Sequence, residues 1–458
     1  MRKTLLMALC AALLLIGPGL FLPALANSAQ TWWSGTDGAG LIVTEGECPI
    51  EVTRERLTFE LWEFPENFYD VGEEESFLAY SGMVSAEYTF LNPTDLTVDV
   101  RLAFPFGQQP HYSPFWNGEA DDAEKYGVSV DGQEIERRIR HTYRADYADF
   151  YLEEDLPRLS DGYLEDDFFL PGMTVTRYAF RADGVDSRYS AANAAFDFVP
   201  ASDVRILFPQ LNGGSALGGD RFRAEAWVEN GDTFEVYAIG GAFFPEWTFY
   251  RDGACRDGEE IAGMMSLTEV ETLTFEELAL SSFDPEGDVS AIDWYNAFVC
   301  LLNDNHWQGG LLGTDRLSAS DLLRWYEYEL TFAPGQTLVN RVEAPIYPDI
   351  DTDCTPSLYT YTYLLSPAGT WADFGELEIV LNTPFYLIDD DSFEKTEGGY
   401  RKIMPGLPEG ELVFSLAAEP TVTRPASFFG CRLNLSPAGP ALLGLFALAP
   451  VLILRRRA

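Results

Sequence analysis

The sequence predicts a mostly β ectodomain: two β-sandwich-like domains with a small helical insert, and one hydrophobic segment at each end of the chain. Short runs that alternate apolar and polar residues recur along the chain, separated by Pro, Gly, Asn and Asp. This pattern is typical of half-buried strands joined by turns. Hydrophobic residues make up 47% and aromatic residues 14% of the 458 residues, which excludes a disordered chain.

The N-terminus has the layout of a secretory signal peptide. Arg2 and Lys3 precede an apolar core at 5–16, and residues 24–26 read Ala-Leu-Ala, a small-x-small cleavage site. We expect signal peptidase to cut between Ala26 and Asn27. The alternative is an uncleaved anchor, for which the apolar core is short.

The C-terminus carries the second hydrophobic segment. Residues 435–454 include no charged side chain, and three arginines follow at 455–457. At ~1.5 Å per residue this run reaches roughly 30 Å, enough for one transmembrane helix in contact with membrane lipid. The positive-inside rule then keeps the arginines in the cytoplasm and the ectodomain outside. A buried core helix is the alternative.

A Gly430-Cys431 pair stands just before this run. Together with the apolar helix and the terminal arginines, it resembles the Cys-containing bacterial C-terminal sorting signals of the Synergist-CTERM and Myxo-CTERM type. The resemblance implies cleavage near Cys431 by a membrane sorting protease, with transfer or lipidation of the mature protein at the cell envelope or cell surface.

The predicted elements follow in order. After the signal peptide (1–26), an N-terminal β-domain (27–145) includes a hairpin about the turn at 92–95 and another about Asp131-Gly132. An acidic, aromatic loop (146–171) leads into a continued β-region (172–290) with a hairpin about 229–232.

The helical insert is predicted at 291–328. Asp293 can cap a helix over 294–303, and Ser320 or Asp321 can begin a second helix, LLRWYEYE, over 322–329. Strands resume in a C-terminal β-domain, followed by a stalk and the sorting tail; these three segments span 329–418, 419–430 and 431–458.

Parts of the ectodomain loosely resemble exported bacterial β-rich domains of unknown function. The shared phrases are LIVTEGECPIEV leading to AEYTFLNPTDLTVDVRLAFPF, and YELTFAPGQTLVNRVEAPIY leading to YTYTYLLSPAGTWADFGELEIVLNTP. The resemblance implies a β-rich extracellular fold and no known activity.

Charge and cysteine usage agree with export. The formal net charge is −43, and a surface of this sign repels nucleic acid, so no nucleic-acid partner is expected. Four ectodomain cysteines outside the cytoplasm indicate two disulfides in any of three pairings. They are Cys48, Cys255, Cys300 and Cys354.

A cation site is predicted at Asp349, Asp351 and Asp353, because carboxylates at i, i+2 and i+4 suit Ca²⁺ in a loop. The segment lacks the glycine and the glutamate of an EF-hand loop. Three further aspartates at 389–391 are a second candidate, or simply a hairpin tip.

No catalytic motif accompanies these features, and the three histidines (111, 141 and 306) are far apart in sequence. The leading hypothesis is therefore a non-catalytic surface protein, structural or ligand-binding. The alternative is an extracellular hydrolase that cleaves glycans through a carboxylate pair.

Overall fold

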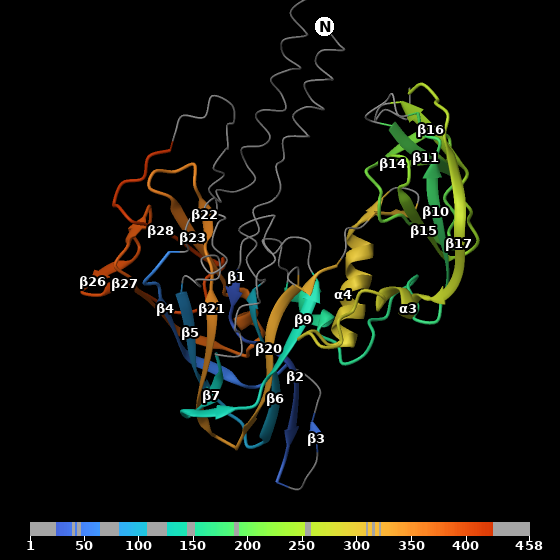
Figure 1. The fold of residues 1–458 in the computed structure, drawn as a ribbon. Helices are drawn as coiled ribbons and strands as arrows, with labels where there is room; N and C mark the ends of the chain where they lie inside the picture. The colour runs from blue at the N-terminus through green and yellow to red at the C-terminus, as the bar shows by residue number, and fades with distance from the viewer. Residues whose placement is uncertain are drawn as a thin grey trace, which may run out of the picture.

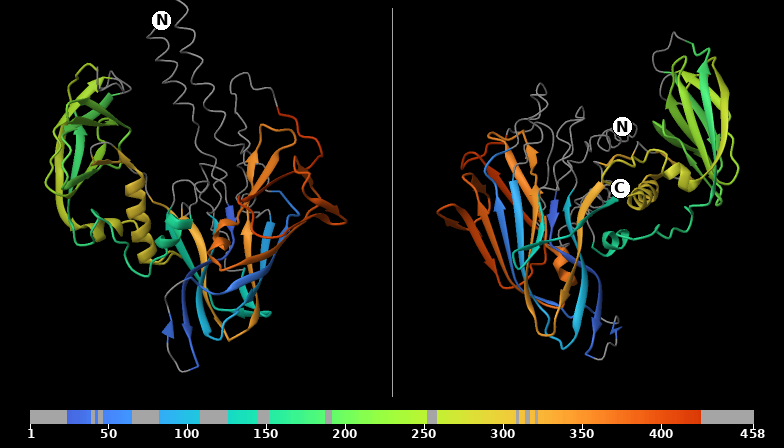
Figure 2. Two further views of the ribbon diagram at one scale, coloured as in Figure 1. Left: turned by 180° about the vertical axis from the view of Figure 1, so that it is seen from behind. Right: turned by 60° about the horizontal axis from the view of Figure 1, so that its bottom comes forward.

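The computed structural model describes residues 24–38, 42–43, 47–64, 82–107, 126–143, 152–186, 192–251, 258–307, 310–313, 317–319 and 322–424. Within these residues the chain is mostly β and forms two bodies (Figure 1). The large β-body consists of residues 24–143 and 322–424, and the inserted body of residues 152–313. In both views of Figure 2 the green and yellow inserted body stands beside the blue and orange large β-body.

Three sheets build the large β-body. The eight-stranded sheet has the order β26 (Glu394–Thr396), β27 (Gly399–Met404), β24 (Phe374–Asn382), β4 (Glu51–Glu60), β5 (Gly82–Leu91), β21 (Thr337–Ile346), β7 (Val128–Val130) and β8 (Gln133–Ile135). A five-stranded sheet has the order β3 (Ile42–Val43), β2 (Ala29–Thr36), β6 (Thr97–Gly107), β20 (Leu322–Phe332) and β9 (Arg138–Tyr143).

The third sheet has the order β1 (Ala24–Ala26), β23 (Leu358–Leu364), β28 (Leu412–Ala417) and β25 (Tyr386–Ile388), with β22 (Asp349–Asp351) paired to β23; a 3₁₀ turn, η6 (Ser366–Thr370), follows β23. All three sheets share one core. Phe59 on β4 packs edge-on against Tyr363 on β23 and Phe414 on β28. Buried aromatic side chains therefore tie together strands of different sheets.

The inserted body is a sandwich with helices at one end. Its six-stranded sheet has the order β17 (Met264–Thr274), β10 (Thr174–Asp183), β15 (Thr233–Gly240), β12 (Val204–Leu207), β19 (Leu311–Leu312) and β18 (His306–Trp307). Its four-stranded sheet has the order β13 (Gly213–Gly218), β14 (Arg221–Trp227), β11 (Ala192–Phe198) and β16 (Trp247–Arg251). The helices are α2 (Leu152–Asp155), η3 (Leu156–Arg158), α3 (Phe275–Ala279) and α4 (Ala291–Asp304).

The helix predicted over 294–303 is confirmed as α4, although Ser290 caps it rather than Asp293. The Ser290 hydroxyl accepts a hydrogen bond from the backbone N–H of Asp293 at 3.0 Å, which satisfies one of the free donors of the first turn. The Asp293 carboxylate is thereby left for a different partner, described below.

The prediction of a second helix over LLRWYEYE is wrong, because this segment belongs to the strand β20. Almost every residue of β20 is buried, because the strand lies between β6 and β9 and both of its faces are covered. A strand buried on both faces loses the alternation that identifies strands, so periodicity alone cannot separate it from a helix.

Two predicted hairpins are also wrong in their pairing. The strands on either side of 92–95 are β5 and β6, and those on either side of 229–232 are β14 and β15; in each case they belong to different sheets. Asn92 is completely buried, and its side-chain amide donates to the carbonyl groups of Leu96 and Ala333 at 2.8 and 3.0 Å. The turn therefore wraps around a core side chain and carries the strand across to the other sheet.

The hairpin about Asp131-Gly132 is confirmed as β7 and β8, which pair antiparallel. Asp131 has φ +47° and Gly132 has φ +78°. Positive φ at both central residues is what a tight two-residue hairpin turn requires.

A buried ionic cluster joins the two bodies. Arg140 on β9 donates to Asp293 on α4 at 2.9 Å and to Glu327 on β20 at 2.9 Å, and it also donates to the carbonyl oxygen of Ser160 at 2.7 Å. Arg140, Asp293 and Glu327 are each at least 95% buried. The Arg140 guanidinium thus pairs with two buried carboxylates, one from each body, and Glu327 has Arg138 as a second partner.

The predicted signal-peptide core, Gly430, Cys431 and the predicted transmembrane helix at 435–454 lie outside the described residues. Among the helices that the structure describes, none has the length and apolarity needed to cross a membrane.

Candidate functional site

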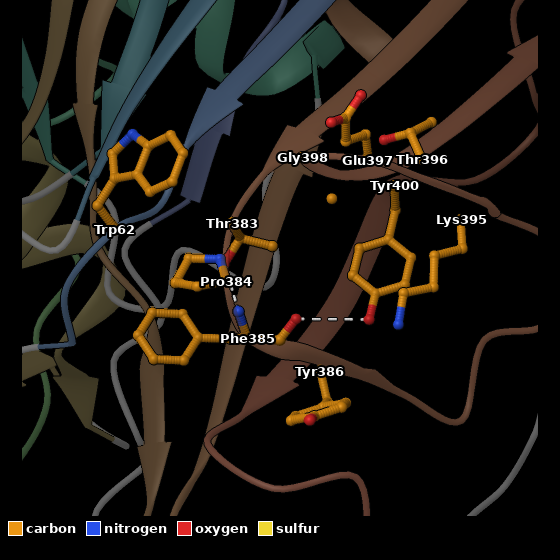
Figure 3. Close-up of a pocket in the computed structure, with 11 residues that line it drawn as sticks. Trp62, Thr383, Pro384, Phe385, Tyr386, Lys395, Thr396, Glu397, Gly398 and Tyr400 are labelled. Carbon is orange, nitrogen blue, oxygen red and sulfur yellow. Dashed lines mark hydrogen bonds between the residues drawn. The ribbon is translucent and has the colours of Figure 1, made fainter.

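A hollow of about 310 Å³ opens at the edge of the large β-body where β25, β26 and β27 meet the end of β4 (Figure 3). We call it the Trp62 hollow. It is lined by Trp62, Thr383, Pro384, Phe385, Tyr386, Lys395, Thr396, Glu397, Gly398, Gly399 and Tyr400. Its volume falls at the lower end of the range found for small-molecule sites.

The floor of the hollow is held by hydrogen bonds to one tyrosine. The Tyr400 hydroxyl accepts from the backbone N–H of Leu387 at 3.1 Å and donates to the carbonyl oxygen of Phe385 at 3.4 Å. The Thr383 hydroxyl accepts from the N–H of Phe385 at 3.2 Å. The loop between β24 and β25 is therefore fixed before any ligand arrives.

Gly399 closes the turn between β26 and β27 beside this loop. Its φ is +151°, and a Cβ built there would lie 1.9 Å from the carbonyl oxygen of Leu381. Only glycine permits this approach, so the residue is required for the shape of the hollow.

Two aromatic side chains of the hollow face solvent. Trp62 is 56% exposed and Tyr386 is 39% exposed. Trp62 Nε1 donates to Glu60 at 2.9 Å, and the same carboxylate accepts from the side-chain amide of Asn382 at 2.6 Å, which fixes the indole ring. Lys395 Nζ lies 5.9 Å from the centre of the Tyr386 ring, within cation–π range.

In Figure 3, Trp62 and Phe385 lie on one side of the hollow, and Tyr400 and Lys395 on the other. Flat apolar rings alternate with hydroxyl, ammonium and carboxylate groups. Such a lining offers ring faces for apolar contact and polar groups for orientation. Glu397 is the single carboxylate among the lining residues. Glycoside hydrolysis in most enzymes uses a pair of carboxylates.

The predicted calcium ligands are not gathered around a cation site. Asp349 and Asp351 lie on β22, and the Asp351 carboxylate accepts from the backbone N–H of Asp353 at 3.1 Å and from the thiol of Cys354 at 3.4 Å. Within the described ranges, no three His, Cys, Asp or Glu side chains are placed together to hold a metal ion. In the second acidic segment Asp390 accepts from the backbone N–H of Ser392 at 2.9 Å, which is an ordinary turn contact.

The predicted disulfides are not formed among the cysteines that the structure describes. Cys48, Cys300 and Cys354 are free thiols, and Cys255 lies outside the described residues. Burial raises the pKa of the thiols of Cys48 and Cys300 to about 11, so both are protonated and unreactive at neutral pH.

The two histidines in the described part of the chain lie on strands of different sheets. His141 is buried on β9, His306 belongs to the short strand β18, and His111 lies outside the described residues. Burial lowers the pKa of His141; Asp293 opposes this effect, the guanidinium groups of Arg324 and Arg140 add to it, and the resulting pKa is about 4. His141 is therefore neutral at pH 7.

The sequence did not indicate the Trp62 hollow. Trp62 is separated from the other lining residues by more than 300 positions, and only the parallel pairing of β4 with β24 brings them together. The one available signal was the position of Trp62, which follows the end of β4 and the buried Leu61.

Comparisons with known proteins give no family for this chain. No protein-family model and no curated protein matches it. Among solved structures, the chain is similar to a crystal structure from Legionella pneumophila subsp. pneumophila of a protein proposed to bind nutrients. The identity is 9%, the TM-score is 0.30, and the match covers 86% of this chain and 70% of that chain. At this level the two chains need not share a fold, and the match says nothing about what this chain binds.

Proposed function

We propose that the chain is an exported, membrane-anchored ectodomain without catalytic activity, and that it binds a ring-shaped, polyhydroxylated ligand such as a sugar unit of a glycan in the Trp62 hollow. Export and anchoring are supported by the two hydrophobic ends of the sequence and by Gly430-Cys431. Binding is supported by the hollow itself.

The observation that carries the binding proposal is the exposed pair Trp62 and Tyr386. Keeping large aromatic faces in water is unfavourable, and here a hydrogen bond holds Trp62 and a cation lies near Tyr386, beside hydroxyl and carboxylate groups. The pyranose ring of a sugar has the matching surface: an apolar C–H face for the aromatic ring, and hydroxyl groups around it for Thr396, Glu397 and Lys395.

The test is a titration of the purified protein with a panel of neutral and acidic oligosaccharides, followed by tryptophan fluorescence and calorimetry. We expect at least one oligosaccharide to bind, and Trp62→Ala to weaken that binding by tenfold or more, as removal of a central aromatic contact does. The matched control is Trp227→Ala, since Trp227 is 53% exposed on β14 of the inserted body. Equal affinity in the Trp62→Ala variant, or no binding by any member of the panel, would refute the binding proposal.

Anchoring is tested by the intact mass of the protein from native membranes, wild type beside Cys431→Ala. We expect the wild type to lose its tail near Cys431 or gain a lipid there, and the variant to keep residues 455–457. If both proteins retain the unmodified arginines, the tail is a plain anchor and the proposed processing at Cys431 is wrong.

A further inference from the structure

The first two residues after the predicted cleavage site are completely buried in the large β-body. Asn27 N donates to the carbonyl oxygen of Leu364 at 2.7 Å, and Ser28 N donates to the hydroxyl of Tyr88 at 2.9 Å. The carbonyl oxygen of Ser28 accepts from Trp371 Nε1 at 2.9 Å. Chain termini usually lie at the surface and are poorly ordered, so a predicted terminus with this many core contacts needs a reason.

Glu55 is the charged residue of this region. It lies on the core face of β4, in phase with Leu57 and Phe59, and none of its surface is exposed. Glu55 Oε2 accepts from the side-chain amide of Asn27 at 3.0 Å, whereas Oε1 is buried with no hydrogen-bond partner among the described residues. A buried carboxylate with an unsatisfied oxygen is costly, whether it is ionised or not.

No cationic side chain of the described chain compensates Glu55. The titratable groups around it are tyrosines: Tyr88 on β5, with Tyr328 on β20 and Tyr363 on β23 beyond it. Burial raises the pKa of Glu55 well above its ordinary value, and the amide of Asn27 and the hydroxyl of Tyr88 lower it by less. Because tyrosines are neutral or anionic, none of these groups can supply a positive charge.

We propose that cleavage between Ala26 and Asn27 creates the missing partner, and that the α-ammonium group of Asn27 pairs with the Glu55 carboxylate inside the large β-body. This inference rests on the proposed export. Hydrolysis adds one water across the peptide bond, so the carboxylate of Ala26 leaves with the signal peptide and the amino group stays on Asn27. An α-amino group with an ordinary pKa of about 7.7–8.0 is a cation at neutral pH.

The geometry suits this exchange. In the uncleaved chain Asn27 N has one hydrogen atom, which Leu364 accepts. The ammonium group keeps that bond and gains two further N–H donors on the same residue whose side-chain amide already reaches Glu55. Processing thus replaces a buried, uncompensated acid by a buried ion pair without moving a side chain into the core.

The pairing of Ala26 and the burial of Asn27 also set the order of cleavage and folding. Ala26 pairs with Leu364 in the parallel ladder of β1 and β23, and Asn27 has no exposed surface, so a protease cannot reach the bond in the folded chain. Cleavage therefore precedes closure of the large β-body, and folding then seals the new terminus beside Glu55.

The experiment compares two forms of the Cys431→Ala chain, which is expected to keep its tail, in the same detergent: the exported protein, and the unprocessed chain made by cell-free synthesis, which keeps residues 1–26. N-terminal mapping first identifies the terminus of the exported form. Thermal unfolding is then measured for each form with and without Glu55→Gln. We expect Glu55→Gln to lower the midpoint of the exported form by about 5 °C, because it breaks a buried ion pair. In the unprocessed form the same change should leave the midpoint unchanged or raise it.

Glu378→Gln is the matched control, because Glu378 is buried in the same sheet and is paired with arginines in both forms. It should lower both midpoints equally. If the Glu55→Gln exported protein fails to fold, the pH dependence of stability is compared between the two forms that keep Glu55 instead. A raised Glu55 pKa makes the unprocessed form lose stability as the pH rises above about 4.5. The paired carboxylate of the exported form gains its stability as the pH rises toward that value and keeps it above.

The outcomes separate the two proposals. An exported protein that does not begin at Asn27 refutes the predicted processing and, with it, the ion pair. An exported protein that begins at Asn27 but responds to Glu55→Gln and to pH as the unprocessed form does refutes the ion pair alone.

Discussion

Glu55 and Glu378 lie on adjacent parallel strands of one sheet but on opposite faces of it. The two carboxylates differ in whether cationic side chains surround them. In the register of β4 and β24, Leu377 is opposite Glu55 and Glu378 is opposite Arg56. Glu55 points into the core and Glu378 to the outer face. On that face Arg54 donates to Glu378 at 2.5 Å and Arg401 at 2.7 Å, with Arg56 at 3.8 Å.

The pKa values differ accordingly. Burial raises the pKa of Glu378, but the hydrogen bond from Arg401 and the charges of the other arginines outweigh burial, and the pKa lies below its ordinary value. Glu55 is also buried, but no cationic side chain lowers its pKa, which therefore lies above its ordinary value. The comparison shows that the sheet provides a partner for an acid on its outer face, while an acid on the core face depends on a charge brought from outside the sheet.

The largest effect is expected where a buried acid loses a partner that is already present. Arg140→Met leaves Asp293 buried without its cation, while Glu327 keeps Arg138, and should lower the free energy of unfolding by about 3–5 kcal/mol in chemical denaturation. Adding Asp293→Asn should recover part of this loss.

The control is Arg181→Met, because the ion pair of Arg181 with Asp183 is about half exposed on both sides; this change should cost no more than about 1 kcal/mol. Equal losses for the two arginine variants would mean that burial does not set the strength of these pairs.

An intermediate effect is expected from His141, a buried base beside Arg140 and Asp293. His141 has a pKa of about 4 when folded, below its ordinary value of 6.5. The unfolded chain therefore binds the proton first, and stability should fall as the pH drops from 6.5 to 4, by about 2–3 kcal/mol in total. Denaturation curves at several pH values should show this slope in the wild type and a flatter one in His141→Gln. The same slope in both proteins would assign the pH dependence to other groups.

A smaller effect sharpens the description of the buried terminus. The Ser28 hydroxyl lies 3.0 Å from the Tyr328 hydroxyl, which also donates to Asn340 at 2.8 Å. Because Tyr328 keeps the second bond, Ser28→Ala should cost only about 1 kcal/mol in chemical denaturation. Ser392→Ala, at an exposed turn, should stay within about 0.5 kcal/mol. A Ser28→Ala protein as stable as the wild type would show that residue 28 is not held in the core.

The sequence predicted the strands well and their partners poorly. Alternation located β4, β5 and β24, because each has one face in the core. It failed for β20, which is buried on both faces, and turn chemistry did not reveal that 92–95 and 229–232 connect different sheets. Which sheet a strand joins depends on contacts between distant residues, and a single sequence does not contain that information.

Of the two candidate sites, only the one at Glu55 had a signal in the local sequence. Glu55 was one of 73 acidic residues, but its spacing of two and four residues from Leu57 and Phe59 places it on the core face of its strand, and this signal was present in the sequence. The Trp62 hollow had no comparable signal, since its walls are assembled from segments at opposite ends of the ectodomain.

The most direct test of the Glu55 partnership is the reactivity of the α-amino group in the exported, folded protein. An acylating reagent at pH 7 labels accessible α-amines, and mass spectrometry of the N-terminal peptide measures the extent. We predict that the amine of Asn27 is protected in the folded protein and becomes reactive only on unfolding. Labelling of Asn27 in the folded protein at the rate of a free peptide would contradict the buried ion pair.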